Sequence, residues 1–111
     1  MTENSQSYVT PDFHATIRIY PTESGGRKSP VFATRFRSWL FSFSDQYWGC
    51  FLLLKDIGPL HPGQEYHGVP FQFLFPDHGL NLHIGMKFYL TEGSHRVAEG
   101  EIEKLSEPTS K

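Results

Sequence analysis

The sequence has little of what a helical, disulfide-bonded or membrane-spanning protein needs. Alanine, the best helix former, occurs only three times in 111 residues. Cys50 is the only cysteine, so an internal disulfide is excluded, and its apolar neighbours predict a small buried side chain in a reducing compartment. No apolar run approaches the roughly 20 residues that cross a bilayer, and the polar N-terminal residues are not a signal peptide. We therefore expect a cytoplasmic protein that has no membrane contact.

The chain also lacks a strong charge of either sign, since its formal net charge is −2. Any anion site must therefore be local. Six histidines are present, but none of them has the ligand spacing of a known zinc site, so we expect no metal and no cofactor. Asp77-His78 resembles part of a hydrolytic dyad, yet no serine or cysteine nucleophile motif accompanies it. We expect no catalytic residues and no enzyme activity.

What the sequence has in abundance is aromatic residues, with ten Phe, five Tyr and two Trp. Eight prolines and ten glycines divide it into short segments. Alternating apolar residues predict strands over 13–20, 35–43, 69–75, 85–90 and 96–105, and an apolar run predicts another over 50–55. No helical periodicity of useful length is present. About six antiparallel strands in a chain of this length indicate an all-β domain, either a small closed barrel or a sandwich.

The sequence also predicts three local features: two exposed aromatic residues, one inward phenylalanine and one bulge. Tyr47 and Trp48 fall in the predicted turn SDQYWG, where aromatic side chains are exposed and available to a partner. Phe75 is expected to point inward with the other alternating residues of 69–75. In the last strand Val97 and Ile102 have opposite parity, which predicts a bulge near Glu99-Gly100.

The order of motifs resembles one known family. The stretches IRIYPTESGGRKSPVF, RSWLFSFSDQYWG, PGQEY and MKFYLTEGSHRVAEGEIEKL are similar in sequence and order to the C-terminal β-barrel, domain III, of translation elongation factor Tu. The resemblance covers residues 13–105. It implies a closed six-stranded antiparallel β-barrel over residues 12–105. The ends of the sequence, residues 1–11 and 106–111, are expected to be flexible tails.

The resemblance also implies what the chain should not do. In the factor this barrel follows a GTPase domain and a middle barrel, and we expect a stand-alone barrel that lacks both. The sequence has no G-x-x-x-x-G-K-[ST] phosphate loop, so we expect no nucleotide binding by this chain alone.

In the factor the surface of the barrel contacts the backbone of aminoacyl-tRNA. The resemblance carries this role to Arg27 and Lys28 in the glycine turn, and to Glu92 and Gly93 in the closing hairpin. Ser38, Trp48 and Phe75 depart from the family pattern at polar or basic positions.

Arg35 and Arg37 are basic residues that the family does not have. They lie two apart on an expected strand, so both side chains should project from one face. Together with Arg27 and Lys28 they predict either a phosphate-binding patch for tRNA or another structured RNA, or an ordinary solvated surface. The alternative partner is a protein, since the family barrel also docks on its own GTPase domain. In that case Tyr47 and Trp48 are the expected contacts.

Overall fold

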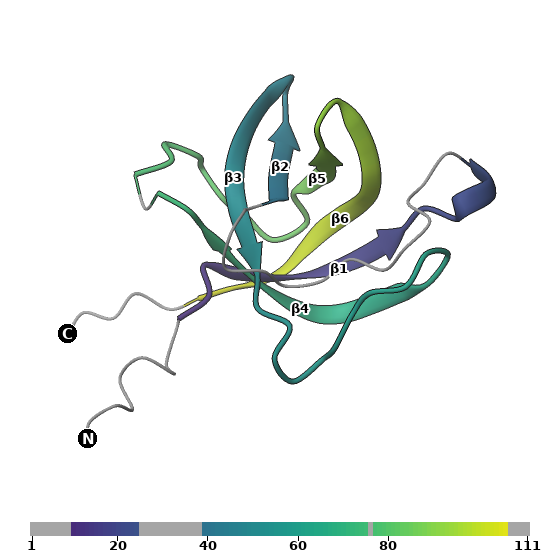
Figure 1. Ribbon diagram of the computed structural model, residues 1–111. Helices are drawn as coiled ribbons and strands as arrows, with labels where there is room; N and C mark the ends of the chain where they lie inside the picture. The colour runs from purple at the N-terminus through teal and green to yellow at the C-terminus, as the bar shows by residue number, and fades with distance from the viewer. Residues whose placement is uncertain (1–9, 25–38, 76, 107–111) are drawn as a thin grey trace.

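The computed structural model describes residues 10–24, 39–75 and 77–106. Their six strands form a closed antiparallel barrel (Figure 1). The elements are β1 (Phe13–Ile19), the short 3₁₀ turn η2 (Thr22–Ser24), β2 (Trp39–Phe43), β3 (Gln46–Leu52), β4 (Glu65–Phe73), β5 (Lys87–Glu92) and β6 (His95–Leu105). Around the barrel the order is β1-β4-β3-β2-β5-β6. The expectation of a small closed six-stranded barrel is confirmed.

Aromatic side chains fill the barrel, as the composition predicts. Phe13 stacks on Phe71 with ring centroids 4.9 Å apart, and Phe41 stacks on Phe88 at 4.5 Å. The two pairs meet edge to face, and their four rings come from β1, β4, β2 and β5. Each such pair contributes about 1 kcal/mol beyond its buried area. Phenylalanines on alternate positions of four strands therefore join opposite walls of the barrel.

The connection from β4 to β5 packs against the core as well as joining strands. Leu80 and Leu82 contact the core cluster, and the His78 ring lies 4.4 Å from the ring of Phe73. The carbonyl of His78 accepts a 3.0 Å hydrogen bond from the indole Nε1 of Trp48. The β3–β4 connection also packs against the core, through its two buried leucines, Leu54 and Leu60.

The β2–β3 turn is shorter than the sequence predicts. Ser44 and Asp45 have φ angles of 55° and 63°, so a two-residue turn with both central residues left-handed closes this hairpin. The strand β3 then begins at Gln46, and the placement of Tyr47 and Trp48 in a turn is wrong. Left-handed turn positions are usually recognised in a sequence by glycine, and here they are occupied by serine and aspartate. The sequence therefore does not predict this two-residue turn.

Two other expectations need correction. The strand β4 begins at Glu65 and ends at Phe73, and Phe75 is 67% exposed instead of pointing inward. The bulge in β6 lies at Val97, because Leu90 pairs with Ala98 while Thr91 pairs with Arg96. Val97 and Ile102 are both buried, as the sequence predicts, but the bulge that allows this lies at Val97 and not at Glu99-Gly100.

The residues at which the expected tails begin, Pro11 and Ser106, are attached to the barrel. The amide of Ser106 donates to the carbonyl of Asp12 at 3.2 Å, and its hydroxyl donates to the carbonyl of Pro11. The Asp12 carboxylate in turn accepts a 2.7 Å bond from the amide of Phe73. Within the described residues, no helix is long and apolar enough to cross a membrane.

Candidate functional site

The residues expected to bind RNA are only partly within the described chain. Arg27, Lys28, Arg35 and Arg37 lie outside the described residues, as does Ser38. Glu92 and Gly93 lie at the β5–β6 hairpin, where Glu92 pairs with His95 and Gly93 has a φ of 61°. A positive φ at the first of two turn residues suits glycine, so the predicted left-handed role of Gly93 is confirmed. His95 and Arg96 are exposed on the same hairpin.

The two aromatic residues expected to contact a partner point to opposite sides of β3. Tyr47 faces outward and is 56% exposed. Trp48 is half-buried, packs edge to face on Phe41 and donates its indole proton to His78. Tyr47 is therefore free to contact a partner, whereas the indole of Trp48 holds the β4–β5 connection in place.

The outward side of β3 is apolar, and the outward position of β2 beside Tyr47 is the polar Ser42. Cys50 and Leu52 point inward, so Tyr47, Gly49 and Phe51 point outward. Gly49 pairs with Leu40 of β2, and its carbonyl accepts a 2.9 Å bond from the amide of Leu74. We call this surface the β3 face. It consists of Leu40, Tyr47, Gly49, Phe51 and Leu74.

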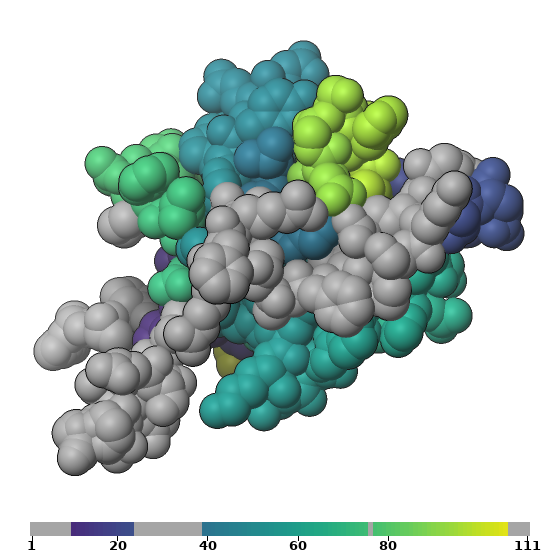
Figure 2. All heavy atoms as spheres, in the orientation of Figure 1, coloured from purple at the N-terminus to yellow at the C-terminus, as the bar shows by residue number. Residues whose placement is uncertain are grey.

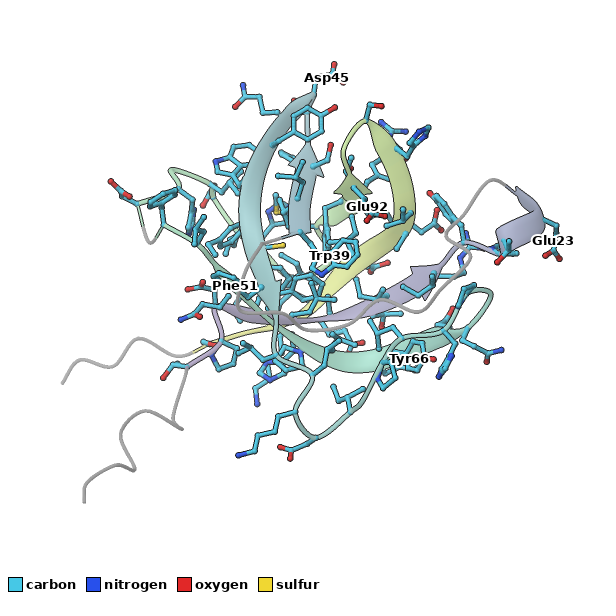
Figure 3. All side chains as sticks on the ribbon, viewed as in Figure 1. Glu23, Trp39, Asp45, Phe51, Tyr66 and Glu92 are labelled. Carbon is cyan, nitrogen blue, oxygen red and sulfur yellow. The ribbon has the colours of Figure 1, made fainter. Side chains whose placement is uncertain are left out.

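The sequence of this region carries almost no charge. Asp45 is the only charged residue between Trp39 and Leu54. Figure 3 shows Asp45 at the tip of the β2–β3 hairpin and Phe51 toward the other end of β3. In Figure 2 the green segment that follows β4 lies beside the blue of β3, in agreement with the bond between Leu74 and Gly49. Leu74 is 42% exposed.

The opposite side of the barrel is densely charged. We call it the β6 face. It consists of Thr16, Arg18, Glu65, His67, Lys87, Tyr89, Glu99, Glu101 and Glu103. Most of these residues line a shallow depression of about 400 Å³. The four carboxylates of the β6 face outnumber its one arginine and one lysine, so this face is unsuited to phosphate.

Pairing across strands satisfies many of these charges. Glu99 forms an ion pair with Arg18 and accepts a 3.2 Å hydrogen bond from Tyr20. The hydrogen bond and charge of Arg18 hold the pKa of the Glu99 carboxyl below its usual value, against the opposing effect of burial. The guanidinium of Arg96 lies 3.8 Å from the centroid of the Tyr89 ring, a cation–π contact.

A Thr–His–Glu arrangement on the β6 face has the appearance of a catalytic group. Thr16 Oγ1 lies 3.0 Å from His67 Nδ1, and His67 Nε2 lies 3.2 Å from Glu65 Oε2. The Thr16 hydroxyl, however, donates its only proton to Glu103. His67 therefore does not receive that proton as a base would, and the arrangement joins strands instead of activating a nucleophile.

Metal binding and thiol chemistry find no support in the described parts of the chain. No group of three or more histidine, cysteine, aspartate or glutamate side chains there has the geometry to hold a metal ion. Glu65 and Glu103 contact opposite nitrogens of the His67 ring, so they do not converge on one point. Cys50 is buried, and burial raises the pKa of its thiol far above the usual value.

Comparison with known proteins leaves the family open. No protein-family model matches the chain, and a search of curated proteins gave no match either.

Proposed function

We propose that the chain is a non-catalytic protein-binding module whose barrel is similar to domain III of elongation factor Tu. The observation that carries the proposal is the β3 face, where Tyr47, Phe51 and Leu74 surround Gly49 with no charge among them. Interfaces are depleted of charge at their centre and enriched in aromatic residues. The burial of Cys50 supports the non-catalytic part, because a buried thiol does not reach a substrate.

The resemblance suggests the first partner to test, a translation GTPase. Purified elongation factor Tu, loaded with GDP or with GTP, is titrated against the chain by isothermal calorimetry. We expect saturable binding that changes little between about 50 and 200 mM salt, because an apolar interface is weakly screened. Tyr47→Ser removes an exposed aromatic side chain from the β3 face and should weaken binding about tenfold.

Ile84→Ser is the matched control, because Ile84 is also an exposed apolar residue, 66% accessible. The next residue, Gly85, donates its amide to Ile102 of β6, on the other side of the barrel from β3. Ile84→Ser should leave binding unchanged. Equal losses in the two variants would show that the partner does not dock on the β3 face.

RNA binding is the second candidate, and one observation favours it. The exposed His95 and Arg96 share a hairpin with Glu92 and Gly93, the hairpin that the resemblance assigns to RNA. The test is a titration with free and aminoacylated tRNA at about 50 and 200 mM salt, with an Arg27→Ala, Lys28→Ala variant. Phosphate contacts predict affinity that falls steeply with salt, and a salt slope smaller by about one for each basic residue lost.

A further inference from the structure

The strands of the barrel are joined unevenly, and the seam between β3 and β4 is short. Residues 39–75 are described without a gap, and within them β3 pairs with β4 over three residues, Cys50 to Leu52. In contrast, β1 pairs with β4 over five residues and with β6 over seven. We infer that the barrel opens reversibly at this β3–β4 seam while β1 and β6 stay paired, and that Trp48 and His78 form a latch that holds the seam closed.

A proline removes one hydrogen bond from the ladder at one end of the seam. The amide of Leu53 donates to the carbonyl of Pro70 at 2.9 Å, so the polar groups of position 70 face β3. In a regular antiparallel ladder this position would also donate its own amide back to Leu53, but proline has none. At the other end, β4 stops at Phe73, and the amide of Leu74 donates to the carbonyl of Gly49 at 2.9 Å. Few hydrogen bonds therefore resist the separation of β3 from β4.

His78 bridges the two strands just beyond this end of the ladder. Its carbonyl accepts the 3.0 Å bond from Nε1 of Trp48 on β3, and its ring lies 4.4 Å from the ring of Phe73, the last residue of β4. Nδ1 of the same ring accepts a 2.9 Å bond from the amide of Leu80, which fixes the connection around it. When β3 moves away from β4, His78 has to release either Trp48 or Phe73. The latch therefore opposes opening directly.

The experiment measures native-state amide exchange of the full chain by NMR. Phe51, which pairs with Gln72 at the centre of the seam, is the reporter. Ile102 on β6, whose amide donates to the carbonyl of Met86 at 2.9 Å, is the reference on the opposite side of the barrel. After correction for intrinsic rates, Phe51 should exchange at least about tenfold faster than Ile102, because a local opening costs less than global unfolding. Equal protection of the two amides would overturn the inference, since the seam would then open only on global unfolding.

Two variants show whether the latch controls the opening. Trp48→Phe removes the indole N–H but keeps an aromatic ring, whereas Tyr20→Phe removes a hydroxyl that donates to Glu99, away from the seam. An interaction affects an opening only if that opening breaks it. Trp48→Phe should therefore speed exchange at Phe51 about fivefold, the contribution of one hydrogen bond. Tyr20→Phe should leave exchange at Phe51 unchanged.

The thiol of Cys50 gives a second readout. Cys50 pairs with Phe73 across the seam and its side chain is fully buried, so opening of the seam gives a thiol reagent access to it. In Trp48→Phe its labelling rate should rise by the same factor as exchange at Phe51, and in Tyr20→Phe it should not change. Equal effects of the two variants on exchange and labelling would overturn the inference, and so would the absence of any effect of Trp48→Phe.

Discussion

The carboxylate of Glu103 on β6 accepts a 3.3 Å hydrogen bond from the backbone amide of Gly68 on β4, across the intervening strand β1. The two residues meet because β1 has an irregular register on both sides. His67 and Gly68 lie opposite the single residue Thr16, and Glu103 is the extra residue where β6 passes His14 and Ala15. Two bulges therefore converge over β1, and Thr16 bonds to Glu103 between them.

This contact predicts a specific loss of stability in acid. The hydroxyl of Thr16 contributes most to holding the pKa of the Glu103 carboxyl below its usual value, and the Gly68 amide and His67 act in the same direction. A depressed folded-state pKa gives stability that is present above the unfolded value of about 4.3 and is lost as pH falls through the folded value. In Glu103→Gln, the fall in the free energy of unfolding below about pH 5 should be shallower, and the cost at neutral pH less than about 1 kcal/mol.

The measurement is urea unfolding between about pH 3 and 7. Glu101→Gln is the control, because Glu101 lies on the same face of the same strand two residues away. Glu101→Gln should keep the acid dependence of the wild type. If Glu103→Gln keeps it too, the contact among Glu103, Thr16 and Gly68 contributes no stability.

Glycine is required at position 68 because of its left-handed backbone conformation, and not because a side chain would lack space. Its φ is 66°, and a Cβ added there would meet no atom within 4 Å. Gly68→Ala should therefore cost about 1–2 kcal/mol, the penalty for a side chain in the left-handed region. Gly68→Asn should cost less, because asparagine adopts this conformation more readily. Chemical denaturation of both variants tests the order, and equal losses would show that the strain is not conformational.

The sequence predicts the barrel and its aromatic core because strand alternation and closure follow from side-chain pattern alone. Phe41 and Phe71, for example, are both buried as expected. It does not predict where strands shift register. The bulge at Val97 and the convergence of Gly68 and Glu103 depend on pairing with strands far away in the chain, which local pattern does not encode.

The β3 face was missed for a related reason. An apolar run such as the one that includes Cys50 and Phe51 is typical of a strand covered on both sides, whereas the structure leaves Phe51 only partly buried. The absence of charge from 39 to 54, apart from Asp45, was the available signal. Of the residues named as binding candidates, Tyr47 remains on an exposed face, and the role of the basic residues 27–37 stays a prediction.

Glycine is required at position 100 because there is no space for a side chain, whereas at position 68 the backbone conformation is the reason. A Cβ at Gly100 would lie 2.5 Å from Cζ of Phe88 and 2.7 Å from Cδ1 of Ile17. Gly100→Ala should destabilise the barrel by about 1–3 kcal/mol, because a packed core does not accommodate an added methyl group. Adding Phe88→Leu removes the closest atom, so the double variant should lose less than the sum of the two single variants. Additive losses in urea unfolding would show that the two residues are not in contact.

Cys50 provides a direct test of whether the barrel opens in solution. Its side chain is fully buried, and burial raises the pKa of its thiol, so both access and the reactive thiolate are suppressed. Reaction with a thiol reagent at pH 8 should be at least about a hundredfold slower in the folded chain than in urea, because it requires transient opening. A short unstructured peptide with one cysteine gives the reference rate. Labelling of the folded chain at that reference rate would contradict a closed barrel in which β3 pairs with both β2 and β4.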